Sequence, residues 1–211
     1  MARLMDVALE KLTSILLEMA TLSEKSVSIS IEAYDEGKKM SEQIKTWSDE
    51  LRKLQDDVSE LAFELIARYQ PVASDLRYVE ACLEISYGFS RFGRYAYDIS
   101  EVMDMFGDLS ECDHSIVEIT AKTTKEMIRM SIDAFANRDV ELAKNIDKLD
   151  DFVDEKYRLH VKSIIEGTVL NVRCSMATTL ILRYLERIAD HSSYIGESVV
   201  FIVTGEKSPR K

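Results

Sequence analysis

The chain has 211 residues, of which 46% are hydrophobic and 31% charged, so it can bury a sizeable core and is globular, not disordered. Its 7 glycines and 2 prolines are few for this length, which excludes a turn-rich sheet protein and predicts an all-α protein with long helices. A net charge of −11 disfavours binding to nucleic acid or anionic membranes and favours a cation or a basic protein partner.

Hydrophobic periodicity predicts three long helices in the first half of the chain. Gly37 is the expected C-cap of the first helix. Pro71 ends the second, because the residue before a proline disfavours helical geometry. Ser74 or a near neighbour is the expected N-cap of the third. The approximate ranges of these helices are 4–35, 38–69 and 74–105.

The second half of the chain repeats this plan. After a break at Gly107, the spacing Ser110-x-x-Asp113 is typical of a capping box and predicts that the next helix begins near residue 111. Gly167 marks a later break, and Gly205 is the expected cap of the last helix. The predicted ranges are 111–136, 140–166 and, after the second break, a helix that ends at residue 203.

Matching residues as well as matching helices indicate a tandem repeat. Segment 30–34 (SIEAY) matches segment 131–135 (SIDAF). Segment 90–95 (SRFGRY) matches segment 186–191 (ERIADH), at an offset of 96 residues. We therefore predict two tandem antiparallel three-helix bundles that bury their apolar strips against each other.

The predicted units are a first three-helix repeat at 1–108, a second at 109–205 and a polar tail at 206–211. Long apolar strips on helices also favour a homodimer. No apolar run approaches the length of about 18 residues that suggests a membrane span. Charged residues interrupt any secretory segment near the N-terminus, so we expect a cytoplasmic protein without direct membrane insertion.

The three cysteines, Cys82, Cys112 and Cys174, are odd in number and show no CxxC spacing. We predict that they neither staple the fold nor bind zinc as a set. They are expected to be ordinary thiols, with Cys82 and Cys174 in helix cores.

One candidate site follows from residue spacing on the last helix. Glu186 and Asp190 are four residues apart, so they stack one turn apart beside the apolar seam. Such a pair is an incomplete site for a hard metal ion. It is equally a common arrangement of solvated acids, and both interpretations stay open at this point.

Three motifs, in order along the chain, resemble those of the PhoU family. Residues 70–77 (QPVASDLR) resemble the "QPxAxDLR" at the start of that family's third helix. Residues 184–191 (YLERIADH) resemble its "YLERIGDH", and residues 200–206 (VFIVTGE) resemble its C-terminal "VxxxVTGE". The resemblance covers nearly the whole chain and includes the tandem three-helix repeat.

The resemblance implies a non-enzymatic cytoplasmic regulator of phosphate uptake and phosphate signalling. Such a protein is an adaptor on the ATPase subunit of the high-affinity phosphate ABC transporter, and in many bacteria it also acts with a sensor kinase. It regulates the transporter negatively when phosphate is sufficient.

The resemblance also implies a metal site, because PhoU proteins can carry metal clusters held by E/D-xxx-D motifs on the second and third helix of each repeat. In the second repeat these positions are Asp150, Asp154, Glu186 and Asp190. The expected cofactor is a divalent or trivalent ion such as iron, manganese, magnesium or zinc. All-oxygen ligands suit magnesium, manganese, calcium or iron better than soft metals.

The first repeat departs from the family's pattern. Ser90 and Arg94 stand where its third helix should carry acids, and Gln55 and Ser59 stand at the matching positions of its second helix. We therefore predict at most one metal site. Tyr194 also replaces the Asn that usually follows the "GDH" motif.

Residues beside the carboxylates have structural and functional interpretations. His191 is expected to be a surface or interface histidine, because a helix turns by about 100° per residue and points it away from Asp190. Arg183 and Arg187 either form simple ion pairs or orient the carboxylates around a metal. Close helix packing is the expected reason for glycine inside two helices, at positions 93 and 196.

Two other functions compete with the regulator. The first is a metal-free helical scaffold, in which the acids are a solvated face. The second is a carboxylate-bridged di-metal redox enzyme, which needs two ExxH motifs, whereas this chain has one, from Glu111 to His114. No nucleophile–base pair or phosphate-binding glycine loop supports catalysis, so we predict that the protein is not an enzyme.

Overall fold

The structure, a computed structural model, describes residues 4–168 and 171–207 and consists there of six helices without a strand. The all-α prediction is confirmed. The helices are α1 (Leu4–Glu36), α2 (Ser41–Tyr69), α3 (Ala73–Phe106), α4 (Ser115–Asn137), α5 (Val140–Ile165) and α6 (Val172–Thr204).

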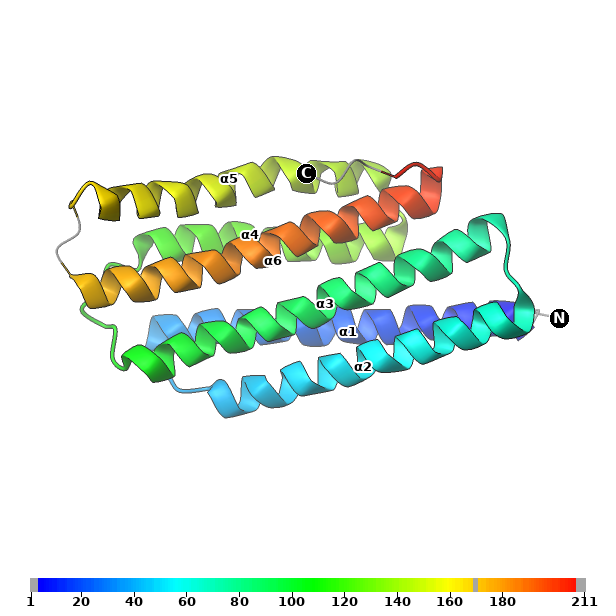
Figure 1. Cartoon of the computed structure of the whole chain (residues 1–211), viewed down its shortest axis with the longest axis horizontal. Coiled ribbons are helices and arrows are strands. Elements are labelled where there is room, and N and C mark those ends of the chain that lie inside the picture. The colour runs from blue at the N-terminus through cyan, green and yellow to red at the C-terminus, as the bar shows by residue number, and fades with distance from the viewer. Residues whose placement is uncertain (1–3, 169–170, 208–211) are drawn as a thin grey trace.

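Helices α3 and α6 run side by side through the middle of the molecule (Figure 1). α1 and α2 pack on α3, α4 and α5 pack on α6, and α1 also touches α4. These are the two tandem antiparallel three-helix bundles that the sequence predicts. α3 has 34 residues and is therefore about 50 Å long, so the molecule is elongated.

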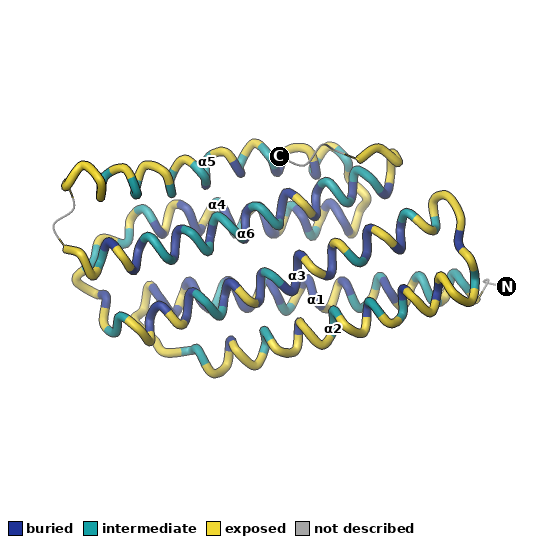
Figure 2. Tube along the Cα trace, in the orientation of Figure 1, coloured by how far each residue is buried: buried dark blue, intermediate teal, exposed yellow. Residues whose placement is uncertain are grey.

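One buried hydrophobic cluster includes residues of all six helices and joins the two bundles. Figure 2 shows the result: buried positions follow the inner faces of α1, α3, α4 and α6, while α2 and α5 are exposed along their outer sides. The two halves thus bury their apolar strips against each other, as expected. Within the described residues, no helix is both long enough and apolar enough to cross a bilayer.

Most helix ends lie where the sequence places them. Gly37 and Gly205 follow α1 and α6 with φ of +66° and +78°, a region that glycine adopts without a Cβ penalty. α2 ends at Tyr69, just before Pro71. α3 begins one residue before Ser74, and no side chain caps it.

The start of α4 differs from the prediction, because the helix begins at Ser115 and not near residue 111. Ser110 and Asp113 do not form a capping box. Instead, Asp108 Oδ1 accepts a hydrogen bond from the Ser110 N–H at 2.9 Å, and Asp113 Oδ1 accepts one from the Ser115 N–H at 2.9 Å. These bonds two residues along the chain stabilise turns in preference to helix.

The glycines inside the helices mark close packing, as predicted. A β-carbon on Gly93 would collide with Leu51 Cδ1 of α2. A β-carbon on Gly196 would lie 3.1 Å from the Ala143 carbonyl oxygen of α5. In both bundles, glycine lets the second and third helices approach closely.

The prediction that no cysteine staples the fold is wrong. Cys112, in the turn between the bundles, forms a disulfide with Cys174 in the first turn of α6, with a Cα–Cα distance of 5.5 Å. The partners are 62 residues apart, so no local spacing indicates the pair. Cys82 is the predicted buried thiol, and burial raises its pKa to about 12.

Arg173 ties the same two segments together. Its Nε donates to the carbonyl oxygen of Phe106, the last residue of α3, at 2.9 Å. Its Nη2 donates to the carbonyl oxygen of Asp108 at 2.6 Å. The start of α6 therefore supplies hydrogen-bond donors to the end of α3, whose last carbonyls lack partners within the helix.

Candidate metal centre

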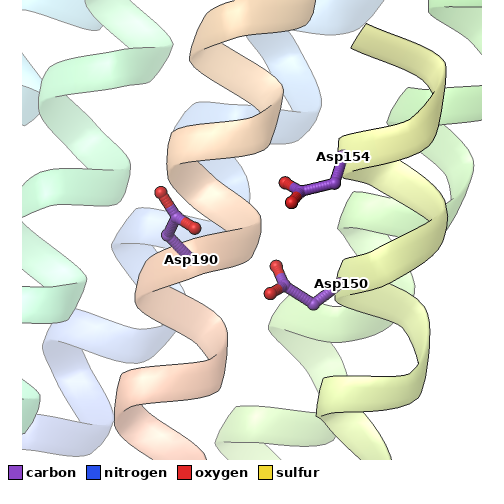
Figure 3. A group of neighbouring side chains, drawn as sticks. All are labelled: Asp150, Asp154 and Asp190. Atoms are coloured by element: carbon purple, nitrogen blue, oxygen red, sulfur yellow. The ribbon is translucent and has the colours of Figure 1, made fainter. Parts of the chain in front are cut away.

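Three carboxylates meet between α5 and α6. Asp150 and Asp154 project from α5 toward Asp190 of α6 (Figure 3). Each offers an oxygen, and these oxygens all lie within 4.8 Å of one another. Asp150 is 7% exposed, so part of this group is withdrawn from water.

The apolar seam of the second bundle sets this arrangement. Ile146 and Val153 of α5 pack with Ala189 of α6 in a small buried cluster. Asp150 and Asp154 are one turn apart on the same face of α5, and Asp190 directly follows Ala189. Close packing beneath the carboxylates therefore brings them together from two helices.

The carboxylates line a pocket of about 560 Å³, called here the acidic pocket. Seven carboxylates and three arginines line it, so its net charge is negative. Its acidic members are Asp147, Asp150, Asp151, Asp154, Glu186, Asp190 and Glu197.

Glu186, the fourth predicted ligand, lines the acidic pocket but is not in the close group. Its carboxylate instead forms an ion pair with Arg183, three residues earlier on the same helix. The structure thus brings three of the four predicted residues together.

Arginines contact two members of the close group. Arg187 Nη1 lies 3.3 Å from Asp190 Oδ2, and Arg158 Nη2 lies 2.7 Å from Asp154 Oδ2. Arg158 was not predicted as part of the site, although its spacing of four residues from Asp154 is the signal that would identify it.

Burial raises the pKa of Asp190, and the nearby Arg187 opposes this shift. Burial likewise raises the pKa of Glu186, against the effect of Arg183. Asp154 raises both values further by charge repulsion. Holding these groups ionised at neutral pH therefore costs free energy, which a bound cation would offset.

The donor set fits a hard cation. Carboxylate oxygens from two helices are the ligands that magnesium, calcium, manganese and iron take. Ser193, one turn from Asp190, also lines the acidic pocket, and its buried Oγ has no hydrogen-bond partner. The sequence interpretation missed Ser193, although its spacing of three residues from Asp190 puts it on the same face.

His191 lies at the interface between α3 and α6, as predicted. Its ring packs near Tyr87 and Tyr95 of α3, with centroid distances of 5.5 and 6.0 Å. Burial lowers its pKa to about 4, and the charges of Arg91 and Arg187 contribute. It is not one of the close carboxylate group.

The single ExxH motif lies elsewhere. Glu111 and His114 precede α4 and do not line the acidic pocket. His114 stacks on Tyr34 of α1 at a centroid distance of 4.4 Å, and its Nε2 lies 3.0 Å from the Leu109 carbonyl oxygen. This histidine therefore packs the turn between the bundles against α1.

The first bundle has a different pocket at the matching place. Gln55, Ser90 and Arg94 line it together with other basic residues. The Ser59 hydroxyl donates to the Gln55 carbonyl oxygen at 3.0 Å. Across residues 4–168 and 171–207, the group of Asp150, Asp154 and Asp190 is the only set of three or more potential ligands close enough to share an ion.

Comparison with known proteins gives consistent matches over most of the chain. The family model described as the PhoU domain matches twice, at residues 16–103 and 117–199. The "Phosphate-specific transport system accessory protein PhoU homolog" of Clostridium acetobutylicum is 30% identical over 207 residues, or 94% of each chain. The protein of the same description from Pseudomonas aeruginosa is 29% identical over 203 residues, or 93% of this chain and 84% of that one.

Two solved structures have the same fold. The crystal structure of PhoU from Pseudomonas aeruginosa superposes with a TM-score of 0.87 at 27% identity, over 95% of this chain and 99% of that one. The phosphate transport system regulatory protein PhoU from Streptococcus pneumoniae gives a TM-score of 0.89 at 22% identity, over 97% and 99% of the two chains.

Proposed function

The chain belongs to the PhoU family, and from that premise we propose that it is a non-enzymatic accessory regulator of phosphate transport. The observation that carries this proposal is the double match to the PhoU domain, which covers both three-helix bundles. Relatives that match over 84% and 94% of their length carry the description of a phosphate-specific transport system accessory protein.

The regulator acts as an adaptor on the ATPase subunit of the phosphate ABC transporter and reduces uptake when phosphate is sufficient. A sensor kinase is a second partner, and the site of action is the cytoplasm. The long exposed faces of α2 and α5 (Figure 2) support this role, because they offer surface for a protein partner without disturbing the core.

Affinity purification of the tagged chain from cells grown in high and in low phosphate tests the adaptor. We expect the transporter ATPase to be recovered, with more of it at high phosphate. A deletion strain should continue phosphate uptake at high phosphate. Failure to recover the ATPase under either condition, together with unchanged uptake, would contradict the proposal.

We also propose that Asp150, Asp154 and Asp190, with Glu186 beside them, bind one divalent or trivalent ion: iron, manganese, magnesium or zinc. Support comes from the close oxygens, the raised pKa of Asp190 and the fit of an all-oxygen donor set.

Elemental analysis of the purified chain and of the Glu186→Gln, Asp190→Asn double variant tests the metal site. We expect a stoichiometric metal that the double variant loses. The matched control is Glu155→Gln, which neutralises an exposed acid of α5 that does not line the acidic pocket. Absence of metal from the unaltered chain after incubation with each candidate ion would refute metal binding.

The metal-free scaffold makes the opposite prediction for stability. If the carboxylates only repel one another, the double variant should melt at a higher temperature than the unaltered chain in every buffer. If they bind a metal, the unaltered chain should gain stability when metal is added and the double variant should not. A melting series with and without metal separates the two functions.

We propose a homodimer as the working assembly. Large apolar side chains on the outer helices support it, for example Phe63 on α2, which is 65% exposed, and Leu159 on α5, which is 48% exposed. Light scattering of the eluted protein should give twice the mass of the chain, and a mass of about 24 kDa would exclude the dimer.

A further inference from the structure

We propose that the first bundle holds a binding site for a small phosphoryl anion, in the pocket of about 310 Å³ between α2 and α3. Lys45 and Arg52 of α2 and Arg91 and Arg94 of α3 line this basic pocket. The proposal depends on these four basic side chains and not on the metal site or the regulatory role. Four basic side chains around one pocket are unexpected in a chain with a net charge of −11.

The carboxylates nearby do not neutralise the basic pocket. Arg52 Nη2 pairs with Asp49 Oδ1 at 2.7 Å, and Arg94 Nη2 pairs with Asp98 Oδ1 at 2.7 Å. Arg91 and Lys45 form no ion pair with any residue that the structure describes. The positive charges of Arg91 and Lys45 are therefore not balanced by a paired carboxylate, and they attract an anion and repel a metal ion.

Arg91 is held in place by one hydrogen bond and keeps several unused N–H donors. Its Nη2 donates to the Tyr95 hydroxyl at 2.6 Å, and its guanidinium carbon lies 4.5 Å from the centroid of that ring. Its Nε is buried and has no hydrogen-bond partner. A buried donor without a hydrogen-bond partner is unfavourable, so the Arg91 guanidinium has unused hydrogen-bonding capacity.

Arg94 is oriented in advance by Asp98. Arg94 Nε and Nη2 lie 3.2 and 2.7 Å from the two carboxylate oxygens of Asp98, which is a fork-to-fork pair. A guanidinium has five N–H donors, so this fork leaves three for another acceptor. The Tyr97 ring, 5.5 Å from the guanidinium carbon, packs against the same side chain.

The donors favour a phosphoryl group over a carboxylate. A carboxylate is planar and is satisfied by a single arginine fork, whereas a phosphoryl group presents several oxygens in different directions. Donors from two helices suit the second geometry, because Arg91 and Lys45 have no ion pair with the described residues and Arg94 keeps three N–H donors outside its pair with Asp98. The pocket has room for a larger ligand that carries such a group, as well as for inorganic phosphate.

The repeat explains how the site arises. At the offset of 96 residues, Ser90 matches Glu186, Arg91 matches Arg187, and Arg94 matches Asp190. One backbone geometry therefore supports a pocket dominated by carboxylates in the second bundle and one dominated by cations in the first.

Isothermal titration calorimetry of the whole chain in EDTA, with inorganic phosphate, pyrophosphate and ATP as separate probes, tests this site. We expect at least one probe to bind, with an affinity that falls as salt rises. The Arg91→Gln, Arg94→Gln double variant should weaken binding at least tenfold. The control Arg68→Gln, which removes a similar i,i+4 partner of Glu64 at the far end of α2, should change it less than twofold.

The result that overturns the proposal is equally specific. It is overturned if none of the three probes binds at millimolar concentration, or if the double variant binds as well as the unaltered chain. Binding that requires added metal and is lost in Asp190→Asn, but not in the double variant, would place the anion at the acidic pocket instead. The effect on uptake in cells is measured separately, so this test can fail without affecting the regulatory proposal.

Discussion

At the scale of single residues, the two predicted metal ligands of α6 differ in their contacts within the acidic pocket. Asp190 belongs to the close group, whereas Glu186 is engaged by Arg183. We expect Asp190→Asn to lower metal affinity at least tenfold and Glu186→Gln to lower it less, because Asp190, unlike Glu186, contributes an oxygen to the close group. Titration of a fluorescent or calorimetric signal with the metal checks this order, and a larger loss in Glu186→Gln would make Glu186 a direct ligand.

His191 predicts how stability depends on pH. Its pKa in the folded state is about 4, below the value of 6.5 expected in the unfolded chain. A depressed pKa means that the unfolded chain binds the proton more readily. The free energy of unfolding therefore includes a contribution that is fully present above pH 6.5 and is lost as pH falls toward 4, by at most about 3 kcal/mol.

The variant His191→Phe keeps an aromatic ring in the interface and removes the titratable group. We expect its unfolding free energy to fall less between pH 6.5 and 4 than that of the unaltered chain. Urea unfolding at a series of pH values measures the difference. His160→Gln is the control histidine, and an identical slope for all three proteins would assign the acid sensitivity to other groups.

At the scale of helices, glycine sets the distance between α5 and α6. In Gly196→Ala, the new methyl group would lie 3.1 Å from the Ala143 carbonyl oxygen, which belongs to the backbone and cannot rotate away. We expect a loss of about 1–3 kcal/mol from overpacking, partly offset by about 1 kcal/mol of better helix propensity.

Urea unfolding of Gly196→Ala, beside the control Ser198→Ala on a half-exposed face of α6, measures this loss. The same shift of α5 should weaken metal binding, because Asp150 and Asp154 move with that helix. A variant more stable than the unaltered chain would show that α5 and α6 can accommodate the additional methyl group without overpacking.

Helices are also the scale at which the sequence is most informative. Apolar periodicity and the glycine caps predict five of the six helices to within a few residues, because both signals are local. The start of α4 is missed because Asp108 and Asp113 bond to nearby backbone N–H groups and compete with the helix. A capping spacing alone does not say which of these alternatives the chain adopts.

The candidate site could be predicted only in part. Spacing and the family resemblance identify Asp150, Asp154 and Asp190, since each lies at a fixed place on a helix. Spacing allows an ion pair for Arg183 and places Ser193 on the face of Asp190. Whether Arg183 pairs with Glu186, and whether the Ser193 hydroxyl is buried, depends on rotamers and packing, which spacing alone does not encode. The Cys112–Cys174 pair depends on contact between segments 62 residues apart.

At the scale of the whole molecule, the disulfide joins the turn between the bundles to the start of α6. Closing a loop of 62 residues removes conformational entropy from the unfolded chain, an effect of about 4 kcal/mol if entropy alone acts. We expect reduction, or the Cys112→Ser variant, to lower the unfolding free energy by up to this amount. Cys112→Ser in reductant is the control, because reductant should not lower its stability further. Equal stability of the unaltered chain with and without reductant would mean that the cross-link contributes nothing.

The same cross-link changes the connectivity of the molecule. Residues 112–174 form a covalent ring that contains all of α4 and α5. A protease that cuts one peptide bond inside this ring leaves a single covalent molecule, because the two pieces stay joined through sulfur. Such a nicked protein migrates as one band on a non-reducing gel and separates into two fragments only when a reductant is present.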